Sequence, residues 1–117
     1  MQPPQQAEIL RIHISESDRY QGKPLYEAII AKCRELGIAG ATVFPGLEGY
    51  GETAELHKAR FVHSHRPILI SIVDTAENIH RLLPIIEPMV DTGLIATSPV
   101  QMIRVRKKTS PDEGRRA

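Results

Sequence analysis

The order of the apolar patterns along the chain is the feature that most narrows the folds open to it. Alternating apolar positions predict strands over residues 9–15, 40–45, 68–74 and 99–106, and apolar positions at three- and four-residue steps predict helices over 23–36 and from Asp74 to Gly93. The predicted order is strand, helix, strand, strand, helix, strand. This is the order of the ferredoxin-like βαββαβ fold, an α+β arrangement in which two helices cover one face of an antiparallel sheet.

The second predicted helix carries its own start and interruption signals. Asp74 and Glu77 have the three-residue spacing of a capping box, which predicts that the helix opens at Asp74. Pro84 and Pro88 each lack an amide donor and clash with the preceding turn. We therefore expect this helix to bend or divide near Leu83.

The face of the sheet that the helices leave uncovered is also apolar. The second faces of the predicted strands carry Ile9, Leu69, Val73, Val100 and Met102, where a solvated sheet would carry polar residues. Because both helices are already assigned, the expected cover is another copy of the chain. The alternative, that these residues are singly scattered and need no partner, stays open.

Length, charge and cysteine content bound the class of protein. The chain has 117 residues, 41% of them hydrophobic, which predicts one compact domain over residues 8–106 between polar tails at residues 1–7 and 107–117 that we expect to be disordered. A net charge of +1 argues against a nucleic-acid partner. No apolar run reaches membrane-spanning length and residues 1–6 do not have the pattern of a signal peptide, so no direct membrane insertion is expected. The single cysteine, Cys33, fits a reducing cytoplasm.

A long polar connection, "FPGLEGYGETAELHKARFVHSHRP", separates the second and third predicted strands. Its glycines, Gly46, Gly49 and Gly51, permit positive φ and close backbone approach to a ligand, but their spacing fits neither the dinucleotide fingerprint nor the phosphate-binding lysine loop. From spacing alone, a strand end with a bulge and a flexible hairpin stays an open alternative.

Several segments together resemble the PII-like signalling family, in its branch related to the nitrogen-regulatory PII proteins. These segments are "GATV" leading to "GYG", then "RPILISIVD", and the closing "SPVQMIRVR", and the resemblance extends from Ile9 to Arg106. It implies a regulatory homotrimer whose bare sheet faces meet at the centre, with adenine nucleotides bound in clefts between subunits. It also implies that the long loop, residues 47–66, contacts a partner protein such as a membrane transporter or channel.

The resemblance assigns candidate residues to both roles. The ligand contacts carried over to this chain are Gly40, Thr42, Gly49, Tyr50, Gly51, Arg104 and Arg106. The candidate partner contacts in the loop are Glu52, Glu55, His57, Lys58 and Arg60. Alternation along the last predicted strand would put Arg104 and Arg106 on one face. A guanidinium group at such a place can bind a phosphate or carboxylate with two parallel hydrogen bonds. The alternative, that both arginines are simply exposed to water at the end of the strand, stays open.

Two departures from the PII pattern argue against tight ATP binding. Leu94 occupies the position of the phosphate-binding lysine, and Glu52 follows the glycine turn where a cation is usual. Together, the two differences make the charge around a bound polyphosphate more negative by two, and each charge–charge interaction with a phosphate is worth on the order of 1 to a few kcal/mol. A monophosphate, a modified nucleotide or another anion fits better, and no cofactor is expected beyond a nucleotide ligand such as AMP, ADP or ATP.

Other classes of function compete with this hypothesis. His57, His63 and His65, which we call the loop histidines, could bind Zn²⁺ or Cu²⁺, so a metal-binding trimer of the copper-tolerance type is the main alternative. A structural assembly subunit without a ligand is another. The cluster of Ser15, Ser17 and Asp18 is explained by turn formation, so we do not expect an enzyme.

Overall fold

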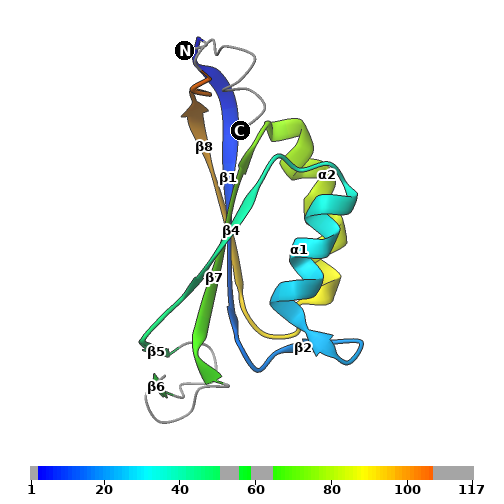
Figure 1. Ribbon diagram of the computed structural model, residues 1–117, viewed down its shortest axis with the longest axis vertical. Helices are drawn as coiled ribbons and strands as arrows, with labels where there is room; N and C mark the ends of the chain where they lie inside the picture. The colour runs from blue at the N-terminus through cyan, green and yellow to red at the C-terminus, as the bar shows by residue number, and fades with distance from the viewer. Residues whose placement is uncertain (1–2, 51–55, 59–64, 107–117) are drawn as a thin grey trace, which may run out of the picture.

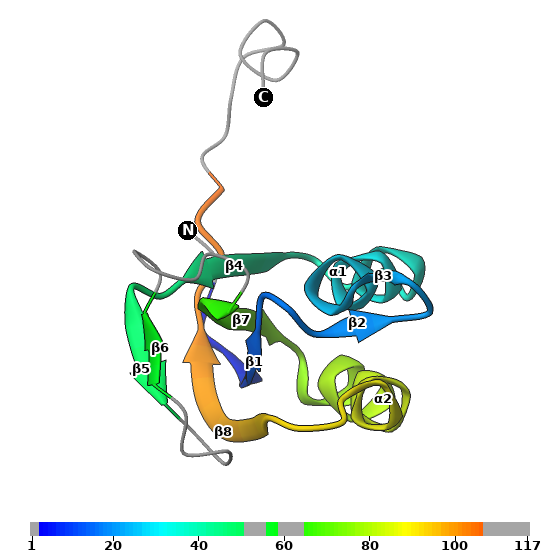
Figure 2. The ribbon, with the colours of Figure 1, turned by 90° about the horizontal axis from the view of Figure 1, so that it is seen from below.

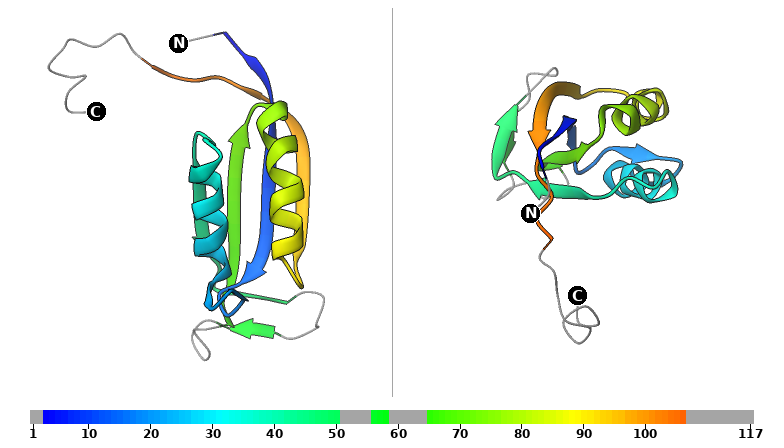
Figure 3. Two further views of the ribbon diagram at one scale, coloured as in Figure 1. Left: turned by 90° about the vertical axis from the view of Figure 1, so that its right-hand side faces the viewer. Right: turned by 90° about the horizontal axis from the view of Figure 1, so that it is seen from above.

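One antiparallel sheet with both helices on the same face forms the body of the molecule. The computed structural model describes residues 3–50, 56–58 and 65–106. The sheet has the spatial order β4-β7-β1-β8 and consists of β1 (Gln5–Ser15), β4 (Ala41–Pro45), β7 (Pro67–Asp74) and β8 (Leu94–Met102). The helices α1 (Leu25–Glu35) and α2 (Ala76–Ile86) lie side by side on one face (Figures 1 and 3). The predicted ferredoxin-like α+β fold is therefore confirmed.

The core lies between the helices and the face of the sheet that they cover. Strand register aligns the apolar positions, because Ile12 of β1 pairs with Ile70 of β7 and Leu10 pairs with Ile72. All four side chains are fully buried, and each contributes about 1.5–3 kcal/mol through removal from water. The helices complete the core with Leu25, Ile29, Cys33, Ile79, Leu82 and Ile86.

The opposite face of the sheet carries no helix among the residues described, and we call it the open face (Figure 2). Its members, in strand order, are Gln5, Ala7, Ile9, Arg11 and His13, then Thr42 and Phe44, then Leu69, Ser71 and Val73, and finally Leu94, Ala96, Ser98, Val100 and Met102. The five apolar residues that the sequence placed on a second face are all among them. Phe44 and Leu94 are 49% and 58% exposed, so this face exposes large apolar side chains to solvent.

The first helix begins two residues later than predicted. Lys23–Pro24 forms a short strand, β3, which pairs with β2 (Arg19–Tyr20). The turn between them places Gln21 and Gly22 at φ of 51° and 82°, the left-handed values that a tight hairpin needs. Because Pro24 is the residue before the helix, it precedes the first turn instead of lying in it.

The start of the second helix also differs from the prediction. Thr75, and not Asp74, is the N-cap, and its hydroxyl accepts a hydrogen bond from the Asn78 amide at 3.2 Å. The helix continues through Pro84 to Ile86, and Pro88 then lies in a short 3₁₀ helix, η2 (Glu87–Met89). The expected division occurs, but three residues beyond Leu83. Pro84 has no amide hydrogen to donate to the carbonyl of His80, and both residues are exposed, so water can reach that carbonyl and the helix continues.

The outer ends of β1 and β8 correct two further predictions. β1 starts at Gln5, so residues 5–7 of the predicted tail pair with Val100–Met102, and Ala7 is buried. β8 spans Leu94–Met102 instead of residues 99–106. Its pairing with β1 ends at Met102, which lies opposite Gln5. The residues that would pair with Ile103 and Arg104 are Pro4 and Pro3, which have no amide hydrogen to donate. The tail at residues 107–117 lies outside the described residues.

The long loop contains a small hairpin of its own. Strand β5 (Glu48–Tyr50) pairs with β6 (Leu56–Lys58), with Gly49 opposite His57. The hairpin lies at the end of the sheet opposite the N-terminus, on the side of the open face (Figures 1 and 2). No helix within the described ranges is long and apolar enough to cross a membrane.

Candidate functional site

A buried carboxylate fixes the backbone at the start of β4, where the first candidate ligand residues lie. Asp74 is 2% exposed and accepts hydrogen bonds from the amides of Ala39 and Thr75, at 2.9 and 2.7 Å. A third donor, the Asn78 side-chain amide, lies 2.9 Å from the same carboxylate. The loop before β4 is thus attached to the N-terminus of α2, and Gly40 follows directly from the attached residue.

The same contacts set the ionisation of this carboxylate. Burial disfavours the charged form of Asp74, but the hydrogen bonds from Ala39, Asn78 and Thr75, with a contribution from the positive charge of Arg104, outweigh it, so the pKa of Asp74 is lowered. Asp74 is therefore ionised at neutral pH. Sequence reasoning treated it as a simple helix cap, because aspartate before a helix is the common signal for one.

The two candidate arginines lie beyond the sheet. Arg104 and Arg106 follow the last residue of β8, Met102, and both side chains are exposed. The prediction that both project from one face of the last strand is wrong, since the strand has already ended. The charge of Arg104 acts on Asp74, which places this cation at the Gly40 end of the sheet. Thr42, on the open face of β4, lies between this end and the loop.

The other candidate ligand residues lie at the opposite end of β4. Glu48–Tyr50, which contains Gly49 and Tyr50, follows the end of the strand, and Gly51 lies outside the described residues. The five residues of β4 span about 17 Å at the rise of an extended strand. One chain therefore does not bring the Gly40 end and the Gly49 end together.

The base of the long loop is closed by specific contacts. The Gly46 amide donates to the Pro67 carbonyl at 2.7 Å, and a Cβ at Gly46 would lie 2.7 Å from Cγ of Pro67, so only glycine fits without a shift. Arg66 donates two hydrogen bonds to Glu16, at 2.6 and 3.1 Å. This fork raises the pKa of Arg66 and ties the downstream end of the loop to the residue after β1.

Several of the remaining candidate loop residues lie outside the part of the chain that the structure describes. Glu52, Glu55, Arg60 and His63 lie outside the described residues, while His57 and Lys58 lie in β6. His65 is exposed immediately before Arg66. Within the described ranges no three metal-ligating side chains cluster, and the metal hypothesis, which needs His63, stays a prediction.

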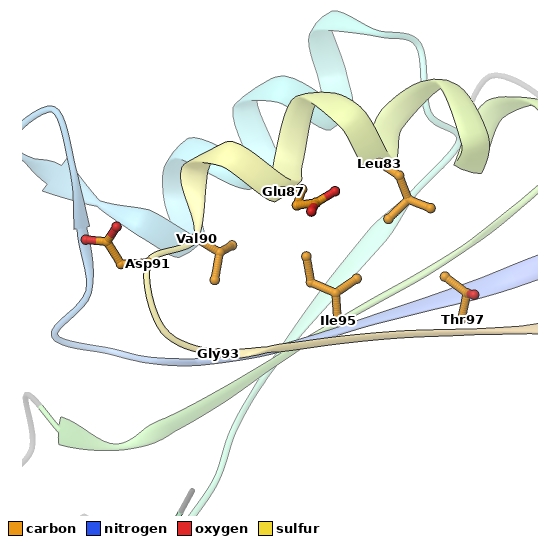
Figure 4. Close-up of a pocket in the computed structure, with 7 residues that line it drawn as sticks. All are labelled: Leu83, Glu87, Val90, Asp91, Gly93, Ile95 and Thr97. Atoms are coloured by element: carbon orange, nitrogen blue, oxygen red, sulfur yellow. The ribbon is translucent and has the colours of Figure 1, made fainter. Parts of the chain in front are cut away.

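A hollow of about 430 Å³ lies between the end of α2 and the start of β8, and it is not the predicted ligand site. Figure 4 shows its lining, in which Leu83 and Ile95 provide apolar surface and Glu87 and Asp91 add two carboxylates. None of the candidate ligand residues lines it. Because two acidic side chains repel an anion, a nucleotide phosphate does not suit this hollow.

Comparison with known sequences places the chain among relatives of nearly equal length. Residues 7–102 match the DUF190 family, described as "Uncharacterized ACR". A UPF0166 protein of Aquifex aeolicus is 38% identical over 97 residues, which cover 81% of this chain and 91% of the relative.

Solved structures share the fold at low sequence identity. CPII from Thiomonas intermedia K12, bound to ADP and bicarbonate, has a TM-score of 0.68 at 17% identity, over 87% of this chain and 93% of that one. A putative PII-like signaling protein from Thermus thermophilus has a TM-score of 0.66 at 15% identity, over 87% and 94%. The divalent ion tolerance protein CutA1 from Ehrlichia chaffeensis reaches 0.53 at 17% identity, over 92% and 87%. The fold described above is thus the PII-like fold.

Proposed function

Because the chain belongs to the DUF190 family and has the PII-like fold, we propose that it is a regulatory protein that assembles as a homotrimer and binds a small anionic ligand between its subunits. The preferred ligand class is an adenine nucleotide smaller than ATP, with AMP and ADP as first choices. The role is regulatory and not catalytic. In the proposed cycle, ligand binding changes the loop 47–66, which binds or releases a partner such as a membrane transporter or channel.

The observation that carries this proposal is the division of the candidate site. The Gly40 end, with Arg104, and the Gly49 end lie at opposite ends of β4, while the open face presents exposed apolar side chains between them. Association through the open face removes that surface from water. It also allows the Gly49 end of one subunit to approach the Gly40 end of the next, so the cleft between two copies contains the complete set.

The assembly is tested first, by sedimentation velocity at micromolar concentration. We expect the mass of three chains for the wild type and dissociation for Val73→Glu, which puts a charge on the open face. Ala31→Glu, an exposed position on α1, is the matched control and should leave the mass unchanged. A monomeric wild type would refute the assembly.

Ligand binding is tested next, by calorimetry with AMP, ADP and ATP, each with and without bicarbonate. We expect Arg104→Ala to weaken binding about 10- to 100-fold, the value of one charged hydrogen bond of roughly 1.5–3 kcal/mol. Arg34→Ala, which removes an exposed arginine from α1, is the control. Equal affinities for the two variants would remove Arg104 from the site.

The loop is tested by limited proteolysis of the assembled protein. Trypsin cleaves after Lys58 and Arg60 in the loop, and we expect the bound nucleotide to change the cleavage rate there several-fold, with little change after Lys32 in α1. A loop that is cut at the same rate with and without nucleotide would separate ligand binding from partner control.

A further inference from the structure

Among its described residues, the open face carries positive charge and no negative charge, and the proposed nucleotide site does not use this charge. Among the described residues of this face, Arg11 is charged and His13 is titratable, and the others are apolar, hydroxyl or amide side chains. The described part of the face carries no carboxylate. Arg11 has no ion-pair or hydrogen-bond partner within the described part of the chain.

Arg11 stands in a polar row that crosses the sheet between two apolar rows. It pairs with Ser71 of β7 on one side and Ala96 of β8 on the other, and Thr42 of β4 pairs with Ser71. Small and hydroxyl residues around a long cation leave room for the guanidinium and for a group bound to it.

The apolar rows lie immediately next to this polar row on both sides. One row contains Ile9 and Val73 and ends in Ser98 on β8, and in the other row Leu69 and Leu94 flank His13. Contact between copies through these apolar rows therefore encloses the row that contains Arg11.

Arg11 lies on β1, one of the two inner strands of the sheet, and near the middle of that strand. In a closed trimer built on the open face, the middle of each face is directed toward the three-fold axis. Three guanidinium groups are then removed from water near one another. Such charges are costly unless they are paired, and the described residues of the faces that meet provide no counter-charge.

We propose that the three Arg11 side chains of the assembly bind one small oxyanion, of the class of inorganic phosphate or sulfate, on the three-fold axis. This inference rests on the proposed trimer and concerns a site distinct from the nucleotide cleft. A tetrahedral oxyanion has three-fold symmetry about one of its bonds, so three guanidinium forks can each donate to it equally. The site is incomplete in one chain, because each subunit contributes one of the three cations.

The test is calorimetric titration of the full-length protein with inorganic phosphate in a chloride buffer. We expect one phosphate per three chains for the wild type. Arg11→Met keeps much of the side-chain length but removes the charge, and we expect binding to weaken at least about 100-fold because three charged donors are lost at once. Arg34→Met is the matched control on α1 and should bind like the wild type.

The outcomes separate this site from both parts of the proposed function. A wild type that sediments as one chain removes the trimer and this inference with it. A trimer that binds three phosphates per three chains, and loses them in Arg104→Ala, places the anion in the nucleotide clefts and refutes the axial site. A trimer whose Arg11→Met variant binds phosphate normally also refutes it. If Arg11→Met fails to assemble, Arg11→Lys keeps the charge without the fork and should bind about 10-fold more weakly, and the wild-type stoichiometry still decides.

Discussion

Replacing Asp74 by asparagine should test whether one buried carboxylate holds the candidate ligand end of the sheet in place. The change keeps one acceptor oxygen for Thr75 and Asn78 but turns an amide nitrogen toward the Ala39 amide, so that two donors face each other. One charge-assisted hydrogen bond is lost, worth about 1.5–3 kcal/mol, and the other two become weaker. We expect the free energy of unfolding to fall by about 3 kcal/mol at pH 7.

Urea denaturation at one fixed protein concentration measures this loss. With an m-value of about 1–3 kcal/mol/M, the midpoint should fall by roughly 1–3 M. Asp91→Asn, an exposed aspartate after η2, is the matched control and should change stability by less than about 0.5 kcal/mol.

The same variant makes a pH prediction whose sign follows from the lowered pKa of Asp74. A carboxylate with a lowered pKa stabilises the fold fully above the ordinary aspartate value of about 3.9, and this contribution disappears as the pH falls through the lower, folded-state value. The gap between wild type and Asp74→Asn should therefore be complete at pH 7 and narrow below about pH 4. A gap that is absent at pH 7, or that matches Asp91→Asn, would refute the assigned role.

Three further predictions concern other parts of the chain. Gly93→Ala should lower the free energy of unfolding, measured in urea, by about 1–3 kcal/mol, because a Cβ there would lie 2.6 Å from a backbone carbonyl oxygen of β1. Gly40→Ala is the control, because a Cβ at Gly40 would meet no atom within 4 Å, and it should be nearly neutral. Equal effects of the two changes would contradict this packing argument. Burial raises the pKa of Cys33 to about 11, so iodoacetamide should label the folded protein at pH 8 at least about 100-fold more slowly than the urea-unfolded chain. The stability contributed by the neutral thiol should be present below about pH 9 and lost as the pH rises toward 11. Rapid labelling of the folded protein would contradict the burial of Cys33. Calorimetry with Zn²⁺ and Cu²⁺ should show no saturable site that alanine at all three loop histidines abolishes, and such a loss would favour the metal-binding alternative.

The central part of the fold could be predicted because its signals are local. The alternation of Leu10, Ile12 and Ile14 reports directly which side of β1 is buried, and no distant residue has to be known. The same argument placed Ile9 and Val73 on the open face, which the strand register confirms.

The last strand could not be predicted correctly from its own residues. "DTGLIATSP" has the composition of a turn, yet Leu94 to Ser98 already pair with β1. Pro99 is tolerated inside β8 because the strand lies at the edge of the sheet and needs hydrogen bonds on one side only. The alternation that predicts a strand as far as Arg106 fails for a distant reason, which is the pair of prolines near the N-terminus.

The candidate site residues stay predictions, and the sequence did not show where in the fold they lie. Gly40 and Gly49 are close in the chain, but β4 runs between them and separates them by its own length, which only the structure shows. The role of Asp74 was hidden because its partner Ala39 is 35 positions away and contributes only a backbone amide, which has no sequence signature.

The contacts that close the base of the long loop make its interior exchangeable. The Gly46 to Pro67 hydrogen bond and the Arg66 to Glu16 fork hold the two ends at fixed positions, whatever sequence connects them. Doubling the length of such a connection costs only about 0.6 kcal/mol in closure entropy. Related proteins can therefore diverge in this segment, in length as well as in composition, and chimaeras that swap it should keep the recipient's fold.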